Sequence, residues 1–112
     1  MEPKPQQIKS YSQPDGTVPV DEWLDSLRDF KGKAKIVKRL ERFRGGNLGD
    51  YRSVGEGVSE LRIDFGPGYR VYFGQVGETI MLLLCGGDKS TQEQDIRTAK
   101  KYWEEYRSRE NA

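Results

Sequence analysis

The stretch from Glu60 to Phe73, ELRIDFGPGYRVYF, decides the fold. Apolar and polar residues alternate on both sides of Gly66-Pro67-Gly68, and such alternation is typical of β-strands with one buried face. The Gly-Pro-Gly tripeptide is a turn signal, so the chain is expected to reverse there. The stretch therefore predicts a β-hairpin whose return strand begins at Tyr69.

The two faces of this hairpin differ in chemistry. A loop of three residues would place Asp64 opposite Arg70 and Arg62 opposite Tyr72 on one face. The other face holds the side chains expected to build the core, which are Leu61, Ile63, Val71 and Phe73. Because arginine offers a rigid fork of donors, the polar face predicts a site for a phosphate-bearing ligand.

The composition predicts one modest domain spanning residues 1–112. Hydrophobic residues make up 34% of the chain and charged residues 33%, which favours a thin layer of sheet and helix over a thick core. The net charge of +1 hides an asymmetry, because residues 31–44 carry seven basic residues and a single acid, Glu41. Such a patch can attract a polyanion although the whole chain is nearly neutral.

Cysteine and histidine usage limits the possible chemistry. Cys85 is the only cysteine, so no disulfide forms within the chain, and its place at the end of an apolar run predicts a buried, unreactive thiol. The chain has no histidine, which excludes Ser-His-Asp and Cys-His catalysis and the common zinc sites. No metal and no cofactor is therefore expected. The start, from Met1 to Pro5, lacks an apolar signal core and no run reaches membrane-spanning length, so we expect a soluble cytoplasmic protein with no membrane partner.

The rest of the chain reads as alternating strands and helices. Residues 6–11 and 51–54 look like short strands, and residues 79–85 look like a strand buried on both faces. A helix is expected from Pro19 to about Asp29, and Gly32 separates it from a second helix that ends at Gly45-Gly46. The inward stripe of this second helix is expected to be Ile36, Val37, Leu40 and Phe43.

A last helix is expected after Ser90 and Glu93, which have the spacing of a capping box. Its inward stripe is Ile96, Ala99, Trp103 and Tyr106. The resulting order, β-α-α-β-β-β-α, predicts a small α+β domain with two helices packed on one face of a mostly antiparallel sheet.

Three segments of the chain carry a resemblance to a known family: Glu60–Ile63, Gly68–Tyr72 and Leu84–Lys89. They look like the RelE/ParE superfamily of toxins from type II toxin–antitoxin systems. The chain resembles most the HigB-like branch, whose members are often labelled addiction-module killer proteins. The resemblance runs from Ile8 to Tyr106 in the same element order, and it implies a RelE-like fold for a single toxin domain.

The resemblance implies two alternative activities. RelE-like toxins are endoribonucleases that cut messenger RNA on the ribosome, whereas ParE-like toxins poison DNA gyrase without a chemical step of their own. Both kinds are neutralised by an antitoxin, which in HigB-like systems is often a helix-turn-helix protein. The first activity implies ribosome and mRNA as partners and a metal-independent cleavage; a third alternative is a relative that has lost its activity and only binds a repressor.

The resemblance also implies roles for four residues. Arg70 matches the phosphate-contacting arginine of the family and is expected to stabilise charge in the transition state, with a salt bridge to Asp64 as the alternative role. Arg62 is expected to bind phosphate, since an arginine side chain holds its proton too tightly to act as a base. Lys89 could orient or protonate the leaving group, with an ordinary exposed loop lysine as the alternative. Glu60 could act as the general base unless it is an ordinary solvated carboxylate.

Further contacts with RNA are expected outside this group. Tyr72 is a candidate for stacking on a base, with packing in the core as the alternative. The basic face of the second helix is a candidate for contact with ribosomal RNA, with an ordinary solvated helix face as the alternative. Its residues are Lys35, Lys38, Arg39 and Arg42.

Overall fold

The hairpin around Gly66-Pro67-Gly68 forms the middle of a five-stranded sheet, in a computed structural model that describes residues 6–111. Its strands are β3 (Val58–Ile63) and β4 (Tyr69–Val76). The connection between them is five residues long, so Arg62 lies opposite Arg70 and Glu60 lies opposite Tyr72. The predicted pairing of Asp64 with Arg70 and of Arg62 with Tyr72 is therefore wrong by two residues, because the turn is longer than its Gly-Pro-Gly centre.

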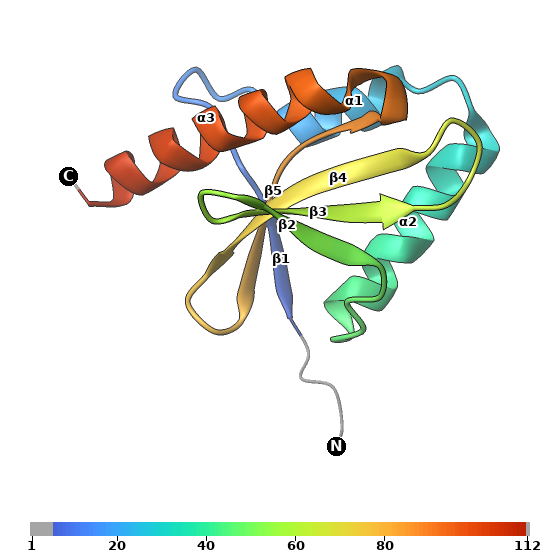
Figure 1. The fold of residues 1–112 in the computed structure, drawn as a ribbon. Helices are drawn as coiled ribbons and strands as arrows, with labels where there is room; N and C mark the ends of the chain where they lie inside the picture. The colour runs from blue at the N-terminus through green and yellow to red at the C-terminus, as the bar shows by residue number, and fades with distance from the viewer. Residues whose placement is uncertain (1–5, 112) are drawn as a thin grey trace.

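The remaining strands extend this hairpin in the order β1-β5-β4-β3-β2 (Figure 1). β2 (Tyr51–Gly55) pairs antiparallel with β3, and β5 (Ile80–Asp88) pairs antiparallel with β4. β1 (Gln7–Ser10) closes the other edge and runs parallel to β5. Four strands follow the first two helices, whereas the expected order β-α-α-β-β-β-α counted three. The strand expected at residues 51–54 is confirmed as β2.

Helices cover both faces of this sheet. α1 (Pro19–Ser26) and α2 (Phe30–Arg44) pack on one face, and α3 (Gln92–Glu110) packs on the other after a short 3-10 turn, η1 (Lys89–Thr91) (Figure 1). The α+β class is confirmed. The expected single thin layer is not found, because the alternating strands bury apolar side chains toward α3 as well.

Each face has its own core. The core under α1 and α2 contains all four hairpin residues predicted to be apolar and buried, together with Ile36 and Phe43 of α2. The core under α3 contains Tyr72, Cys85 and Trp103. Burial raises the pKa of the Cys85 thiol to about 12, so the thiol stays protonated, as expected of an unreactive cysteine.

A β-bulge in β5 changes which residues face each of the two cores. Tyr72 pairs with Cys85 but Phe73 pairs with Leu83, which leaves one extra residue on β5. After the bulge, Gly86 faces α1 and Gly87 faces α3. A Cβ atom at position 86 would collide with the ring of Trp23, so glycine lets α1 lie close to the sheet.

The ends of the helices differ from the sequence-based expectation. α1 ends at Ser26, and Asp29 instead begins α2 by accepting a hydrogen bond of 2.9 Å from the Gly32 backbone N–H. At the start of α3, the Asp88 side chain accepts from the Ser90 backbone N–H at 2.8 Å. The predicted capping box of Ser90 and Glu93 is therefore wrong, because the chain makes a 3-10 turn capped by Asp88 first.

The inward stripe of α2 is only partly as predicted. Ile36 and Phe43 are fully buried, but Val37 is 42% exposed and Arg39 is only 6% exposed. Leu40 packs against the same core, so the prediction fails only at Val37. Arg39 points inward instead, to the carbonyl groups of Asn47 and Leu48. Within residues 6–111, none of the helices combines the length and the apolar character that crossing a bilayer demands. The expectation about Met1–Pro5 concerns residues outside the described range.

We predict that Gly74→Ala lowers the free energy of unfolding by about 1–3 kcal/mol, since its Cβ would overlap the Trp103 ring in a packed core. Urea denaturation followed by circular dichroism measures the change. Gly45→Ala is the matched control, because its Cβ would meet the nearest backbone oxygen at 3.4 Å, an ordinary contact. Equal urea midpoints for the two variants would contradict the close packing of Trp103 on the sheet.

Candidate functional site

The carboxylate of Glu60 is the centre of a polar cluster on the α3 face of the sheet. Glu60 lies on β3 and is fully buried. Its Oε1 accepts a hydrogen bond of 2.9 Å from Arg70 Nη1 and one of 3.1 Å from Arg52 Nε. The Nε atom of Arg62 lies 3.7 Å from the same oxygen. Its Oε2 accepts from Tyr72 Oη at 3.2 Å and from Gln92 Nε2 at 3.0 Å.

We call these six residues the Glu60 cluster: Glu60, Arg52, Arg62, Arg70, Tyr72 and Gln92. The strand register explains how they meet. Arg52, Glu60 and Tyr72 form one row across β2, β3 and β4, and Arg62 and Arg70 form the next row. The α3 helix begins beside them and supplies Gln92.

The cluster has an excess of positive charge. Three guanidinium groups surround one carboxylate, and arginine keeps its proton at any physiological pH. The exposed fraction of the side chain rises from 11% for Arg70 to 39% for Arg62 and 50% for Arg52. A ligand from solvent would therefore meet Arg62 and Arg52 first, with Arg70 beneath them.

The carboxyl of Glu60 is held ionised. Burial alone would raise its pKa, but the hydrogen bonds from Gln92 and Arg52 and the charges of Arg70 and Arg52 outweigh burial. The pKa therefore lies below its ordinary value of 4.5. Glu60 is not the solvated carboxylate that was one alternative, and both of its oxygens are occupied by donors of the protein.

Tyr72 packs in the core, which was the alternative to stacking on a base. Its side chain is fully buried and its hydroxyl donates a hydrogen bond to Glu60, so its ring is not available to stack on a base. Burial and the nearby Glu60 charge raise the pKa of Tyr72, so that the phenol stays a donor. Arg70 pairs with Glu60, so the alternative of a bridge from Arg70 to Asp64 is not what the structure shows.

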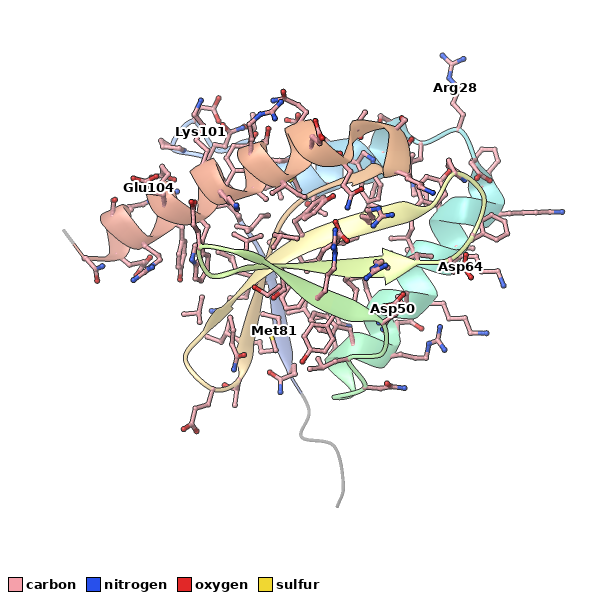
Figure 2. The ribbon with its side chains drawn as sticks, viewed as in Figure 1. Arg28, Asp50, Asp64, Met81, Lys101 and Glu104 are labelled. Atoms are coloured by element: carbon pink, nitrogen blue, oxygen red, sulfur yellow. The ribbon has the colours of Figure 1, made fainter. Side chains whose placement is uncertain are left out.

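Arg62 joins the cluster to part of the basic face of α2. A cleft of about 320 Å³ lies between α2 and the end of β3. Its charged lining residues are Lys35, Arg39, Arg42, Asp50, Arg62 and Asp64. Asp50 and Asp64 lie at this end of the sheet beside α2 (Figure 2), and Asp50 Oδ1 lies 3.7 Å from Arg62 Nε. Arg39 is buried against loop carbonyls, which leaves Lys35 and Arg42 as the exposed cations that α2 adds here.

Two predicted cations lie outside this arrangement. Lys38 is exposed on the outer side of α2 and lines a different hollow. Lys89 is exposed in η1 and lines a hollow of about 500 Å³ with Gln92 and Arg97. Gln92 borders both that hollow and Glu60, but no contact seen among residues 6–111 joins Lys89 to Arg70.

The structure adds a carboxyl group to which sequence reasoning assigned no role. Gly87 lies opposite Arg70 in the register, and a Cβ on Gly87 would collide with Asp95 Oδ2 of α3. Asp95 therefore lies above the sheet one strand away from Arg70. Burial, opposed by a hydrogen bond from Thr91, raises the pKa of Asp95. A carboxyl with a raised pKa is better suited to take up a proton than Glu60 is.

Arg52 and Gln92 were also missed. The Gly55-Glu56-Gly57 turn could have indicated that Arg52 lies opposite Glu60, because such a turn fixes the register of a hairpin. Gln92 had no comparable signal, since it reaches Glu60 across 32 positions of the chain.

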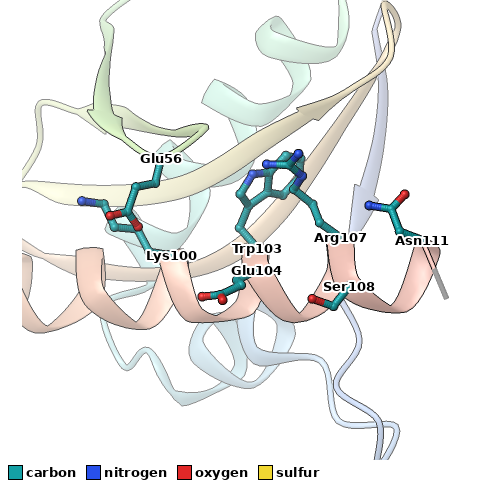
Figure 3. Close-up of a pocket in the computed structure, with 7 residues that line it drawn as sticks. All are labelled: Glu56, Lys100, Trp103, Glu104, Arg107, Ser108 and Asn111. Atoms are coloured by element: carbon teal, nitrogen blue, oxygen red, sulfur yellow. The ribbon is translucent and has the colours of Figure 1, made fainter.

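A separate hollow of about 690 Å³ lies about three helical turns further along α3. Figure 3 shows its lining, where Glu56 and Lys100 stand on one side of Trp103 and Arg107 and Asn111 on the other. The Trp103 Nε1 is buried and has no hydrogen-bond partner in the described part of the chain. The charges of this hollow are mixed, so it does not select an anion as the Glu60 cluster does.

We predict that Glu60→Gln lowers the free energy of unfolding by about 3 kcal/mol, because it leaves three arginines without their buried counter-ion. Urea denaturation at pH 7 measures the loss. Glu104→Gln, at an exposed position on α3 (Figure 2), is the matched control and should change stability little. A Glu60→Gln variant as stable as the control would show that the arginines do not depend on the carboxylate.

The lowered pKa of Glu60 also predicts how stability depends on pH. A carboxyl whose pKa falls on folding adds stability above its unfolded pKa, near 4.5, and loses it as the pH falls through the lower folded value. The natural chain should therefore lose more stability than Glu60→Gln between pH 7 and pH 3. Urea midpoints at both pH values test this, and parallel losses would contradict it.

Comparison with known proteins places this chain beside one uncharacterised relative. No protein-family model matches the chain. An uncharacterized protein of Haemophilus influenzae is 51% identical over 84 residues, which cover 75% of this chain and 85% of the relative. The chain belongs to the same family as this Haemophilus influenzae protein.

Proposed function

We propose that this protein is the toxin of a type II toxin–antitoxin module, with a RelE-like fold of the HigB-like kind, and that it cleaves messenger RNA on the ribosome. The observation that carries the proposal is the Glu60 cluster, in which three arginines from β2, β3 and β4 surround one carboxylate. The resemblance of residues 60–63, 68–72 and 84–89 to RelE/ParE toxins supports the same reading. An antitoxin, expected to be a helix-turn-helix protein, would neutralise it.

The proposed cleavage needs no metal, and the bonds that form and break all belong to the RNA. The ribose 2′-OH loses its proton and its oxygen bonds to the adjacent phosphorus. The bond from phosphorus to the 5′ oxygen then breaks, and that oxygen takes up a proton. The products are a 2′,3′-cyclic phosphate and a free 5′-OH. The pentacovalent phosphorane between these steps carries extra negative charge, which nearby cations stabilise.

Arg62 and Arg70 are the residues assigned to the scissile phosphate. Arg62 is the more open and would bind the phosphate oxygens from solvent, while Arg70 adds positive charge from beneath. The Nε atoms of both are buried and lack a hydrogen-bond partner within residues 6–111.

Glu60 is assigned a positioning role and not that of the base. Its carboxylate is fully buried and accepts hydrogen bonds at both oxygens, so a 2′-OH has no free lone pair to approach. Its value to the site is to hold the guanidinium planes in a fixed arrangement before RNA arrives.

Proton transfer is assigned to groups that flank the cluster. Asp95 has a raised pKa and lies one strand from Arg70, which suits the removal of the 2′-OH proton. Lys89 keeps its predicted role at the leaving oxygen, at the other side of Gln92. The cleft with Lys35 and Arg42 continues from Arg62 and gives the RNA backbone a basic path toward α2.

We predict that Arg62→Ala and Arg70→Lys each reduce mRNA cleavage about a hundredfold, since each removes donors aimed at the phosphorane. Primer extension on transcripts after induced expression measures cleavage, with growth arrest as a second readout. Arg28→Ala is the matched control, because Arg28 is an exposed arginine before α2 that points away from the sheet (Figure 2). Thermal midpoints of the purified variants separate a lost site from a lost fold.

The gyrase alternative gives a different result in the same experiment. A gyrase poison would arrest growth with intact transcripts, an induced SOS response and trapped DNA cleavage complexes. Full growth arrest with unbroken mRNA would overturn the endoribonuclease proposal.

A further inference from the structure

The outer side of α2 carries an exposed apolar stripe. Phe30 is 81% exposed and Val37 is 42% exposed. Together with Ala34 they occupy positions i, i+4 and i+7, which lie on one side of a helix. They line a hollow of about 520 Å³ whose other lining residues are Lys33, Lys38 and Glu41. A phenylalanine that is four-fifths exposed on an ordered helix is unusual, since burial of such a ring is favourable.

The exposure of Phe30 follows from how α2 is fixed at its start. Asp29 accepts a hydrogen bond from the Gly32 backbone N–H at 2.9 Å and another from Tyr69 Oη at 2.7 Å. Tyr69 lies in β4, so the first turn of α2 is tied to the sheet. Ile36 and Phe43 face the core and thereby turn Phe30 outward. The stripe is therefore held in place before any partner binds.

Positive charge flanks this stripe on both sides. Lys33 borders one side and Lys38 the other, and Lys31 extends the second flank by helical spacing. Glu41 is the one acid between residues 31 and 44. The surface therefore complements a segment with apolar residues in a row and acidic residues beside them.

We propose that the outer face of α2 docks an acidic amphipathic helix of a partner protein. The spacing of Phe30, Ala34 and Val37 matches the anchors of a helix that packs along another helix. The basic flanks supply the charge that orients an acidic partner and speeds its encounter. This inference goes beyond the proposed nuclease and holds whether or not the chain cleaves RNA.

The apolar stripe favours a protein partner over RNA on this face. RNA would neutralise Lys33 and Lys38 but would leave a row of aliphatic and aromatic carbon without an apolar partner. The exposed cations that line the Arg62 cleft, Lys35 and Arg42, lie on a different side of α2. This proposal assigns Lys38 to contact with protein, whereas the sequence-based prediction assigned it to RNA.

The test uses designed peptides and the full chain. The probe is a helical peptide of about 18 residues with leucines at i, i+4 and i+7 and glutamates beside them. Two matched peptides replace the glutamates by lysines or the leucines by serines, and a single-stranded RNA oligonucleotide serves as a fourth probe. Backbone amide shifts of the isotope-labelled protein in an NMR titration report where each probe binds and how tightly.

Of the four probes, we expect only the acidic amphipathic peptide to shift the amides of Phe30, Ala34 and Val37. Phe30→Ser with Val37→Ser should weaken its binding at least about tenfold, since these side chains are exposed and the fold does not need them. Lys33→Glu with Lys38→Glu should weaken it as well. Lys101→Glu, on the outer side of α3 away from α2 (Figure 2), should leave the affinity unchanged.

Three results would overturn this docking proposal. The acidic peptide could fail to shift the amides of Phe30, Ala34 and Val37, the serine peptide could bind as tightly as the leucine peptide, or RNA could produce the same shifts where the peptide does not. Because none of these measurements uses cleavage, their failure leaves the nuclease proposal to its own test.

Discussion

The burial of one carboxylate, that of Glu60, is the constraint on which the rest of the polar face depends. An ionised carboxylate removed from water is costly unless donors surround it. Glu60 meets this need with donors from β2, β4 and α3, so the partners come from elements far apart in the sequence. The same contacts that stabilise the carboxylate hold three arginines together, and the fold cannot form this face without also forming the positive cluster.

The bulge between β4 and β5 lets α1 and α3 pack closely on opposite faces of this sheet. Since Leu84 and Cys85 both face the α3 core, the glycines that follow change sides relative to an unbroken strand. Gly86 receives the ring of Trp23 and Gly87 receives the carboxylate of Asp95. Any larger residue at either position would push α1 or α3 away, and with α3 would go both Gln92 and Asp95.

The sequence predicts which residues share this face of the sheet better than it predicts which of them lie opposite one another. Alternation along Glu60–Phe73 placed Glu60, Arg62, Arg70 and Tyr72 on one side, and this holds although the predicted register was wrong by two residues. A slip of two keeps every side chain on its face, whereas a slip of one would have reversed the prediction. Which residues of β3 and β4 lie opposite one another, and hence the role of Glu60, depends on the length of the turn. Gly-Pro-Gly alone does not determine that length.

Charge patterns along α2 show a second limit. The seven basic residues between positions 31 and 44 appear as one patch in the sequence, but the fold gives them different environments. Arg39 is buried against carbonyl groups, Lys35 and Arg42 line the Arg62 cleft, and Lys33 and Lys38 flank the apolar stripe. The spacing of apolar residues did not distinguish these environments, because it predicted Val37 on the inward side of α2, where the structure has Arg39.

The two uses of α2 are coupled through the charges that they share. The helix is about 10 Å across, and the Debye length at physiological salt is about 8 Å. An acidic helix on the outer face would therefore lower the positive potential in the Arg62 cleft without covering it. Because attraction of RNA to the cleft depends on that potential, a partner bound to the stripe would weaken RNA association most at low salt. Such a partner would restrain the proposed nuclease while Arg62 keeps its exposure to solvent.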